Sequence, residues 1–257
     1  MGVNRSGKLT LALARSGRLQ AAEQSSSRAV ALAVQEGEHE SAASYQAARA
    51  VWEALCGNAA EGIKSALAAL ELSKGRDVEY AAGFALALSG EFSQSRALAG
   101  DLEKDFPEDT FVQFTYAPVL RALAALRRAK PAESVDRLEI ARSYELAANG
   151  LSFNGSYLGG LHSAYVRGEA FIAARRYAEA ATEFQKILDH RGIVALDPIG
   201  ALAHLQLARA YVSLGDKGKA KAGYEAFLAL WKDADRANPI LKSANAEYSR
   251  LQAATPR

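Results

Sequence analysis

The sequence has little of what a disulfide-stabilised or β-sheet protein needs. Its 257 residues include one cysteine, one methionine and six prolines. The single cysteine, Cys56, excludes an internal disulfide and fits a reducing compartment. Few prolines and no sustained alternation of Val, Ile and Thr leave little room for a sheet. We therefore expect an essentially all-α chain.

The sequence also lacks an excess of either positive or negative charge. Lysine and arginine total 31 against 29 aspartates and glutamates, so the net charge is only +2. A protein that binds nucleic acid usually concentrates basic residues on one face, and this balance predicts no nucleic-acid partner. No uninterrupted apolar run approaches the roughly 18 residues of a membrane span, so we expect no membrane insertion. The expected location is the cytoplasm, or an extracytoplasmic one if a membrane span precedes this region in a parent protein.

Residues with catalytic chemistry are few and dispersed. The chain has four histidines: His39, His162, His190 and His204. None is spaced with another His, Cys or Glu as in helical zinc sites. The carboxylates, such as Glu36, Glu38 and Glu40, occur in solvated runs and not as an isolated pair in an apolar pocket. The sequence therefore predicts no catalytic residue, no metal, no cofactor and no enzyme activity.

What the chain does contain is an internal repeat, because segments 164–188 and 204–228 follow one pattern. Gly168 and Phe171 in the first segment correspond to Ala208 and Tyr211 in the second. After a turn, an alanine, an aromatic and a bulky apolar residue recur in both: Ala180, Phe184 and Ile187, then Ala220, Tyr224 and Phe227. Such spacing predicts two antiparallel helices per repeat, and a period of roughly 34 to 40 residues is typical of a stacked helical repeat.

Turn residues extend this pattern along the chain. The predicted turns between paired helices are Ser16-Gly17, Cys56-Gly57, Ser89-Gly90, Ala129-Lys130, Arg175-Arg176 and Leu214-Gly215. Glycine at four of the six fits a left-handed residue that closes the first helix of a pair. Asp197-Pro198 and Asn238-Pro239 each place a capping side chain before a proline at the start of a helix. Six helix pairs result, followed by one amphipathic helix that caps the last pair.

The repeated residues resemble those of tetratricopeptide repeats (TPR). Gly83 and Gly168 stand at the small position of that family, Phe171 and Tyr211 at its aromatic position, and Pro107 at the proline that closes a repeat. The resemblance implies an all-α fold, a right-handed superhelical α-solenoid of about six TPR-like helix pairs with a C-terminal capping helix. Residues 1–257 would then form a single solenoid. Its parts would be degenerate pairs at 1–146, a Gly/aromatic insert at 147–160, two well-formed pairs at 161–236 and the capping helix at 237–253.

A narrower resemblance rests on three strings, residues 183–194, 197–205 and 230–235. They resemble the C-terminal TPR region of acidobacterial serine/threonine protein kinases, which is taken to mediate protein interaction. The kinase module itself has no counterpart here, because the sequence contains no His-Arg-Asp or Asp-Phe-Gly string and no Gly-rich phosphate loop before a strand. Kinase activity is therefore not implied.

The inner face of such a superhelix is lined by the first helix of each pair, and that register selects candidate binding residues. The predicted partner-binding residues are Tyr80, Phe84, Tyr116, Leu123, His162, Tyr165, Glu169, Ile172 and Arg209. This face is apolar and aromatic with sparse charge, which suits a peptide or an amphipathic helix held by aromatic anchors. Two alternatives stay open: a tighter winding of the superhelix, or the insert, would bury this face.

The sequence thus predicts a non-catalytic scaffold for protein–protein interaction, or a regulatory module, of a bacterial signalling protein such as a serine/threonine kinase. Its partner would be a protein or peptide, with self-association also possible. The alternative is a solenoid that senses a small molecule and regulates an attached kinase or transcription module. The TPR clamp for acidic chaperone tails is not expected. That clamp needs asparagine after the small position, where this chain has Phe84, Leu123, Glu169 and Arg209.

Overall fold

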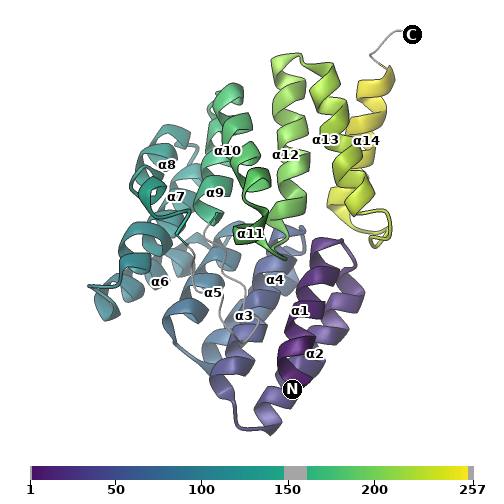
Figure 1. The fold of residues 1–257 in the computed structure, drawn as a ribbon. Helices are drawn as coiled ribbons and strands as arrows, with labels where there is room; N and C mark the ends of the chain where they lie inside the picture. Colours follow the sequence, from purple (N-terminus) through teal and green to yellow (C-terminus); the bar gives the residue numbers. More distant parts are fainter. Residues whose placement is uncertain (1, 148–160, 254–257) are drawn as a thin grey trace.

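The computed structural model describes residues 2–147 and 161–253, and within them it contains helices and no strand (Figure 1). The predicted Gly/aromatic insert at 147–160 lies, except for Ala147, outside the described residues. Twelve helices form six antiparallel pairs: α1 (Gly2–Arg15) with α2 (Leu19–Gln35), α3 (His39–Leu55) with α4 (Ala59–Leu72), α5 (Arg76–Leu88) with α6 (Phe92–Asp105), α7 (Ala117–Arg127) with α8 (Pro131–Leu138), α9 (His162–Ala173) with α10 (Tyr177–Asp189), and α12 (Ile199–Leu214) with α13 (Lys217–Leu230). Helix α14 (Pro239–Ala253) follows and packs against α13. The predicted all-α solenoid of six pairs with a capping helix is confirmed.

Three shorter elements complete the chain. A π-helical turn, η1 (Val112–Tyr116), leads into α7, and a 3-10 turn, η2 (Ile140–Ser143), follows α8. The short helix α11 (Arg191–Val194) connects α10 to α12. The predicted caps are present, because Asp197 Oδ1 accepts from Ile199 N at 2.8 Å and Asn238 Oδ1 accepts from Ile240 N at 2.8 Å. Each satisfies a backbone donor in the first turn of its helix.

All six predicted turns contain a residue with positive φ. The glycines are Gly17, Gly57, Gly90 and Gly215, with φ between 72° and 101°. In the other two turns Ala129 and Arg175 adopt φ of 54° and 60°, a conformation that the β-carbon disfavours. The turn geometry of the repeat is thus kept even where the chain has no glycine.

Alanine dominates the buried surface, so neighbouring helices approach one another closely. At Gly168 a β-carbon would lie 2.6 Å from Phe184 Cζ, and at Gly223 one would lie 2.9 Å from Ala208 Cβ. Both glycines therefore mark places where the two helices of a pair touch. Large side chains fill the remaining space, and Trp52, Phe84, Phe184 and Phe227 are fully buried.

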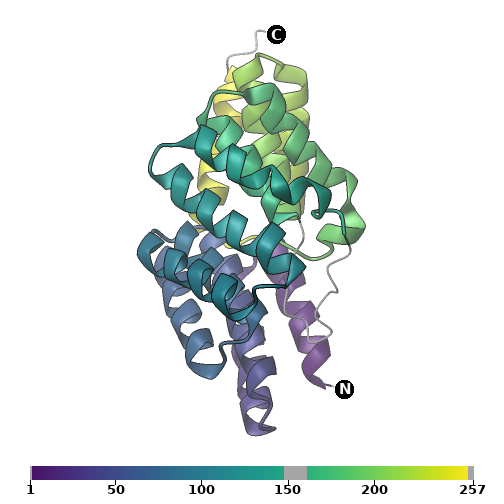
Figure 2. The same ribbon diagram turned by 90° about the vertical axis from the view of Figure 1, so that its left-hand side faces the viewer.

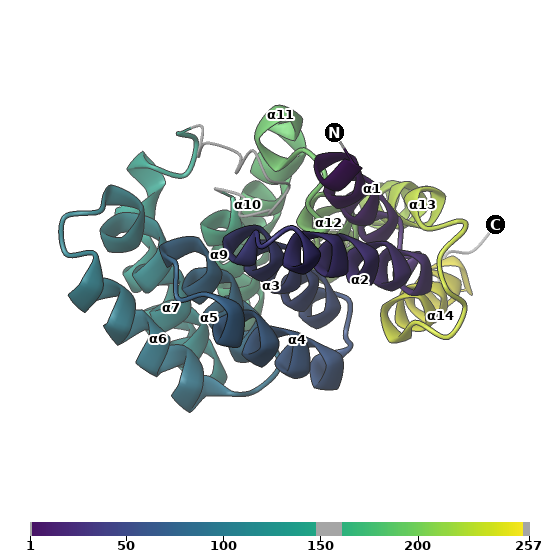
Figure 3. The ribbon, with the colours of Figure 1, turned by 90° about the horizontal axis from the view of Figure 1, so that it is seen from below.

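The solenoid winds far enough that its first pair meets its last. Helix α1 contacts α12, and Figure 3 shows α1 close to α12 and α13. The segment that connects α13 to α14 makes three hydrogen bonds to backbone carbonyls of the N-terminal pairs. Trp231 Nε1 donates to the carbonyl oxygen of Arg15 at 2.9 Å, Asp235 N donates to that of Gly17 at 3.0 Å, and Asn238 Nδ2 donates to that of Cys56 at 3.2 Å. We call these three hydrogen bonds the closure contacts. Figure 2 shows the N-terminal pairs (purple to blue) lying against the C-terminal pairs (green to yellow).

Arginines at one repeat position link successive pairs. Arg49, Arg121 and Arg167 occupy equivalent places relative to the turns that end α3, α7 and α9. Arg49 pairs with Glu23 of α2 at 2.6 Å, and Arg121 pairs with Glu103 of α6. In each case the guanidinium crosses from the first helix of one pair to the second helix of the pair before it. We call an ion pair made by an arginine at this repeat position, which connects successive helix pairs, an ionic joint.

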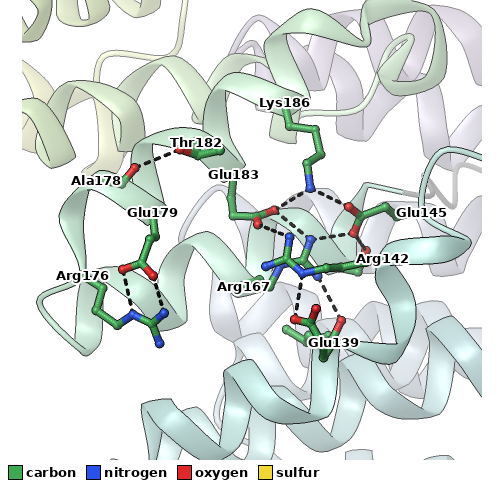
Figure 4. A network of polar contacts seen from close by, with 12 residues as sticks. Glu139, Arg142, Glu145, Arg167, Arg176, Ala178, Glu179, Thr182, Glu183 and Lys186 are labelled. Carbon is green, nitrogen blue, oxygen red and sulfur yellow. Dashed lines mark hydrogen bonds and ion pairs between the residues drawn. The ribbon is translucent and has the colours of Figure 1, made fainter.

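The joint at Arg167 is the most deeply buried (Figure 4). Its guanidinium is inaccessible to solvent and lies 2.7 Å from Glu145 Oε2 and 2.8 Å from Glu183 Oε2. Lys186 Nζ contacts the same two carboxylates at 2.6 and 3.1 Å, and Arg142 contacts Glu183 Oε1 at 3.0 Å. Burial alone would raise the pKa of Glu183, but the hydrogen bond and charge of Arg167 and the charge of Lys186 outweigh it and hold that pKa below its ordinary value. The network joins the fourth pair to the fifth beside the undescribed segment.

Candidate interaction groove

The inner face begins with a packed cluster at the N-terminal ends of its helices. The rings of Tyr80 and Tyr116 stack at 3.9 Å, and the ring of Phe84 stacks on His162 at 4.5 Å. Tyr80 Oη lies 3.3 Å from His162 Nδ1, while His162 Nε2 lies 2.7 Å from Asp197 Oδ2. Each polar atom of the imidazole therefore has a partner, which is what burial of this group requires.

Five of the predicted partner-binding residues lie inside this interior. Tyr80, Phe84, Tyr116, His162 and Tyr165 are each 5 % exposed or less. They pack across pairs three to six, since His162 contacts both Tyr80 of α5 and Asp197, which precedes α12. This half of the face is therefore buried, and both alternatives left by the sequence, tight winding and the insert, stay open because residues 148–160 lie outside the described part of the chain. The role of these five residues in binding a partner stays a prediction.

The other four predicted residues line an open cavity of about 590 Å³. Leu123, Glu169, Ile172 and Arg209 face it from α7, α9 and α12. We call this cavity the interaction groove, and its full lining is Ala87, Leu88, Ser89, Gly90, Phe92, Leu123, Leu126, Arg127, Glu169, Ile172, Ala173, Gln206 and Arg209. It runs along the C-terminal ends of the first helices of pairs three to five and reaches α12 in pair six. Its walls are mainly apolar, and Leu88, Leu126 and Ile172 are partly exposed there.

One end of the groove is polar, and its polar side chains are hydrogen-bonded to one another. Glu169 Oε1 accepts from Gln206 Nε2 at 2.6 Å, and Arg209 pairs with Glu247 of α14 through two contacts at 2.8 and 2.9 Å. Burial raises the pKa of Glu169, and the positive charge of Arg209 and hydrogen bonds from Tyr165 and Gln206 offset this only in part. A partner would meet a preorganised polar surface here.

The other end carries a cation with no carboxylate partner. The guanidinium of Arg127 lies over the ring of Phe92, 5.5 Å from its centroid. No ion pair to Arg127 is formed by the described residues, whereas its neighbours Arg128 and Lys130 both pair with Glu133. Arg127 and Phe92 together present a charge on an apolar platform.

Register reasoning on the first helices alone missed part of this lining. Phe92 begins a second helix, so a rule restricted to first helices passes over it. Arg127 reads in the sequence as a solvated cation at a helix C-terminus, where cations are common. The sequence did contain a signal for both residues. Phe92 follows the turn at Gly90 and Arg127 ends α7, and aligning the repeats places these two helix ends on the same edge of the solenoid.

A second hollow, also of about 590 Å³, continues beyond Arg209. It is lined by Arg209, Val212, Ser213, Gly215, Lys217, Tyr224, Glu247, Arg250 and Leu251. Val212 and Leu214 are 44 % and 46 % exposed, so apolar surface extends along the end of α12. Because Arg209 lines both hollows, the two form one extended inner surface.

In residues 2–147 and 161–253 no helix is both long and apolar enough to cross a membrane. The same part of the chain has no group of three or more His, Cys, Asp or Glu side chains placed to hold a metal ion.

Comparison with known proteins gives structural neighbours and no sequence relatives. No protein-family model matches the chain, and no curated protein matches it significantly. Among solved structures, the apo form of RapI is similar with a TM-score of 0.48 and 14 % identity, covering 98 % of this chain and 71 % of RapI. The TPR domain of P58(IPK) is similar with a TM-score of 0.37 and 13 % identity, covering 99 % of this chain and 81 % of that domain. At these identities neither neighbour assigns a partner or an activity to this chain.

Proposed function

We propose that the chain is a non-catalytic scaffold for protein–protein interaction that binds an α-helical or extended peptide in the interaction groove. The observation that carries the proposal is an open, mainly apolar groove along four helix pairs; at one end lies Arg127, which forms no ion pair with the described residues. A cavity of this size accommodates several side chains of a peptide, and partly exposed Leu88, Leu126 and Ile172 offer them apolar contacts.

The charges in the groove favour a particular kind of peptide. Arg127 is available to a carboxylate, while Arg209 is already neutralised by Glu247. An amphipathic segment with apolar residues on one face and an acidic residue near Phe92 would satisfy both features. If the chain self-associates, a segment of a second copy would occupy the interaction groove in place of the peptide.

The signalling context is part of the proposal and rests on sequence strings alone. Residues 183–194, 197–205 and 230–235 resemble the TPR region of acidobacterial serine/threonine kinases. We infer that the chain regulates or recruits partners for such a signalling protein. Sequencing the surrounding gene would test this, because a kinase, membrane or DNA-binding module in the same reading frame is the expected finding.

Selection of peptides from a helical display library tests the binding function. Peptides selected on the wild-type chain are labelled with fluorescein, and their binding is measured by fluorescence anisotropy. The double variant Leu126→Glu and Ile172→Glu should weaken binding at least tenfold, because it places charge on the apolar wall. Arg127→Gln should weaken acidic peptides and leave neutral ones unchanged.

Leu67→Glu is the matched control, since Leu67 is 41 % exposed on α4 and lies outside the groove lining. It should bind the selected peptides as the wild type does. Selection of no peptide, or equal binding to the groove variant and the control, would contradict the proposal. A dimer of the wild type that the double variant loses in sedimentation would identify the partner as a second copy.

A further inference from the structure

A separate cavity lies where the two ends of the solenoid meet. Its volume is about 340 Å³, within the range of small-molecule pockets. Arg15 from α1, Arg191 from α11 and His204 from α12 all line it. The rest of its lining is small or apolar: Ile187, Leu188, Val194, Gly200, Ala226, Ala229 and Leu230.

The three basic side chains are gathered without a carboxylate. No Asp or Glu is among the described residues that line this cavity. Arg191 forms no ion pair within the described part of the chain, and Arg15 donates instead to the carbonyl oxygen of Ala195. Elsewhere in this protein buried or half-buried arginines pair with glutamates, as Arg49, Arg167 and Arg209 do. The half-buried Arg15 differs from those three, because its hydrogen bond goes to a backbone carbonyl and not to a carboxylate.

The backbone around the cavity is shaped to admit Arg15. At Gly200 a β-carbon would lie 2.8 Å from Val194 Cγ1 and 3.3 Å from Arg15 Nη2, so a side chain there would press on the guanidinium. Ala195, whose carbonyl oxygen accepts from Arg15, adopts a left-handed φ of 47°. These features fix the Arg15 guanidinium beside the cavity.

The pKa of His204 reflects its burial and the positive charges that surround it in this cavity. Burial lowers the pKa of His204, and the positive charges of Arg191 and Arg15 lower it further. A negative group bound in the cavity would oppose the effect of the two arginines and raise the pKa of His204.

We propose that this cavity binds a small molecule carrying a phosphate or carboxylate group on a compact apolar body. Two guanidinium groups and an imidazole N–H supply directed donors for the anionic oxygens, which planar guanidinium forks suit well. Ile187, Leu188 and Leu230 supply a wall for the apolar part. The site is distinct from the interaction groove, because the two share no lining residue.

The placement of the site gives binding a structural consequence. Arg15 belongs to the first helix pair, whereas Arg191 and His204 belong to the fifth and sixth pairs or the connection between them. An anion held by all three would bridge the two ends of the solenoid beside the closure contacts. The ligand would therefore bind the closed form in preference to any opened form.

Titration of the full chain with phenyl phosphate, benzoate and benzyl alcohol, at constant ionic strength, tests the proposal. Isothermal calorimetry should detect binding of phenyl phosphate or benzoate at millimolar concentrations or below, and the tighter of the two names the anionic group. Proton NMR of the His204 ring should show its pKa rising when that anion is present. Neutral benzyl alcohol should bind at least tenfold more weakly.

Arg191→Gln is the decisive variant, because Arg191 is exposed and removing its charge breaks no ion pair of the described residues. Its Kd for the anion should be at least about tenfold weaker, as expected for loss of a charge-assisted hydrogen bond. Arg96→Gln, at an exposed arginine of α6 outside the cavity, should bind as the wild type does. The proposal is overturned if no anion binds the wild type, or if Arg191→Gln leaves the affinity and the His204 titration unchanged.

Discussion

The indole Nε1 of Trp231 donates a hydrogen bond to the carbonyl oxygen of Arg15, joining residues 216 positions apart. Trp231 is 1 % exposed and packs beside Gly17, where a β-carbon would lie 2.8 Å from the indole ring. The closure of the solenoid is thus a packed and hydrogen-bonded interface. In an open helical-repeat protein the terminal pairs have no such contact.

Replacing Gly17 with alanine should destabilise the chain more than replacing Gly37. Both glycines have φ above 70°, so alanine costs about 1–2 kcal/mol at either site. At Gly17 the new methyl group would also lie 2.6 Å from Ala234 Cβ, whereas nothing lies within 4 Å at Gly37. Overpacking should add about 1–3 kcal/mol to the cost of Gly17→Ala. Urea unfolding measures both free energies, and equal losses would mean that the closure is not formed in solution.

Removing the charge of Arg167 should be among the most damaging single changes. Arg167→Met leaves Glu145 and Glu183 buried with only Lys186 and Arg142 to balance them, and loss of one member of a buried ion pair costs about 3–5 kcal/mol. Arg176→Met is the matched control, because Arg176 pairs with Glu179 at the exposed end of the same helix pair (Figure 4). Its effect in thermal unfolding should be much smaller than that of Arg167→Met, because Arg176 loses only an exposed ion pair and its contact over the Phe171 ring. Similar losses for the two variants would show that the network around Arg167 contributes little.

Acid should weaken the docking of α14 through Glu247. Burial by itself would raise the pKa of this carboxyl, but hydrogen bonds from Arg209, Ser243 and Tyr224, together with the charge of Arg209, lower it to about 2. Because the folded pKa is below the unfolded one, the stabilisation is complete above about pH 4.5. It is lost progressively as the pH falls toward 2.

Unfolding free energies measured between about pH 6 and about pH 2, a range that spans that interval, check this assignment. Glu247→Gln should already be less stable than the wild type near neutral pH. The difference between the two proteins should shrink as the pH falls, because the wild type loses what the variant lacks. Parallel pH profiles would contradict the role of Glu247.

Gly168→Ala and Gly100→Ala should change stability in opposite directions, although both glycines are helical. At Gly168 the methyl group would meet the fully buried ring of Phe184, which is also held edge-on by Tyr165, so a loss of about 1–3 kcal/mol is expected. Gly100 is exposed on α6 with nothing within 4 Å, and alanine there should stabilise by up to about 1 kcal/mol. Chemical denaturation compares the two, and a neutral Gly168→Ala would mean that α9 and α10 are less closely packed than described.

Local features of the fold were predictable because neighbouring residues determine them. A positive φ at Gly57 or Gly215 follows from the turn that ends a helix, and the caps at Asp197 and Asn238 follow from an acceptor directly before a helix start. The six pairs and the final helix required nothing more. Aligning the chain on its turn residues also places Arg49, Arg121 and Arg167 in one register, so the ionic joints were accessible from the sequence although they were not identified.

Closure was not predictable, because it depends on the sum of small rotations between pairs. Gly17 reads as a helix-ending glycine, and nothing near it in sequence indicates that Trp231 and Ala234 also exclude a side chain there. Tyr80 and His162 were predicted to bind a partner, with burial left open as the alternative; both lie in the interior, whereas Leu123 and Ile172 line the groove. The repeat register predicts which face a residue lies on, and the packing of the whole chain determines whether that face is open.

The Trp231 to Arg15 contact also sets a time scale for biosynthesis. At about 5–20 residues per second, a ribosome needs roughly 10–40 s to extend the chain from Arg15 to Trp231. Throughout that interval Trp231 is not yet present to pack on the turn at Gly17, even if α1 and α2 have already paired. The first pair, although made before the other five, is therefore not fully packed until Trp231 has been added, and nascent chains halted before residue 231 should be more sensitive to proteases and more dependent on chaperones than the full chain.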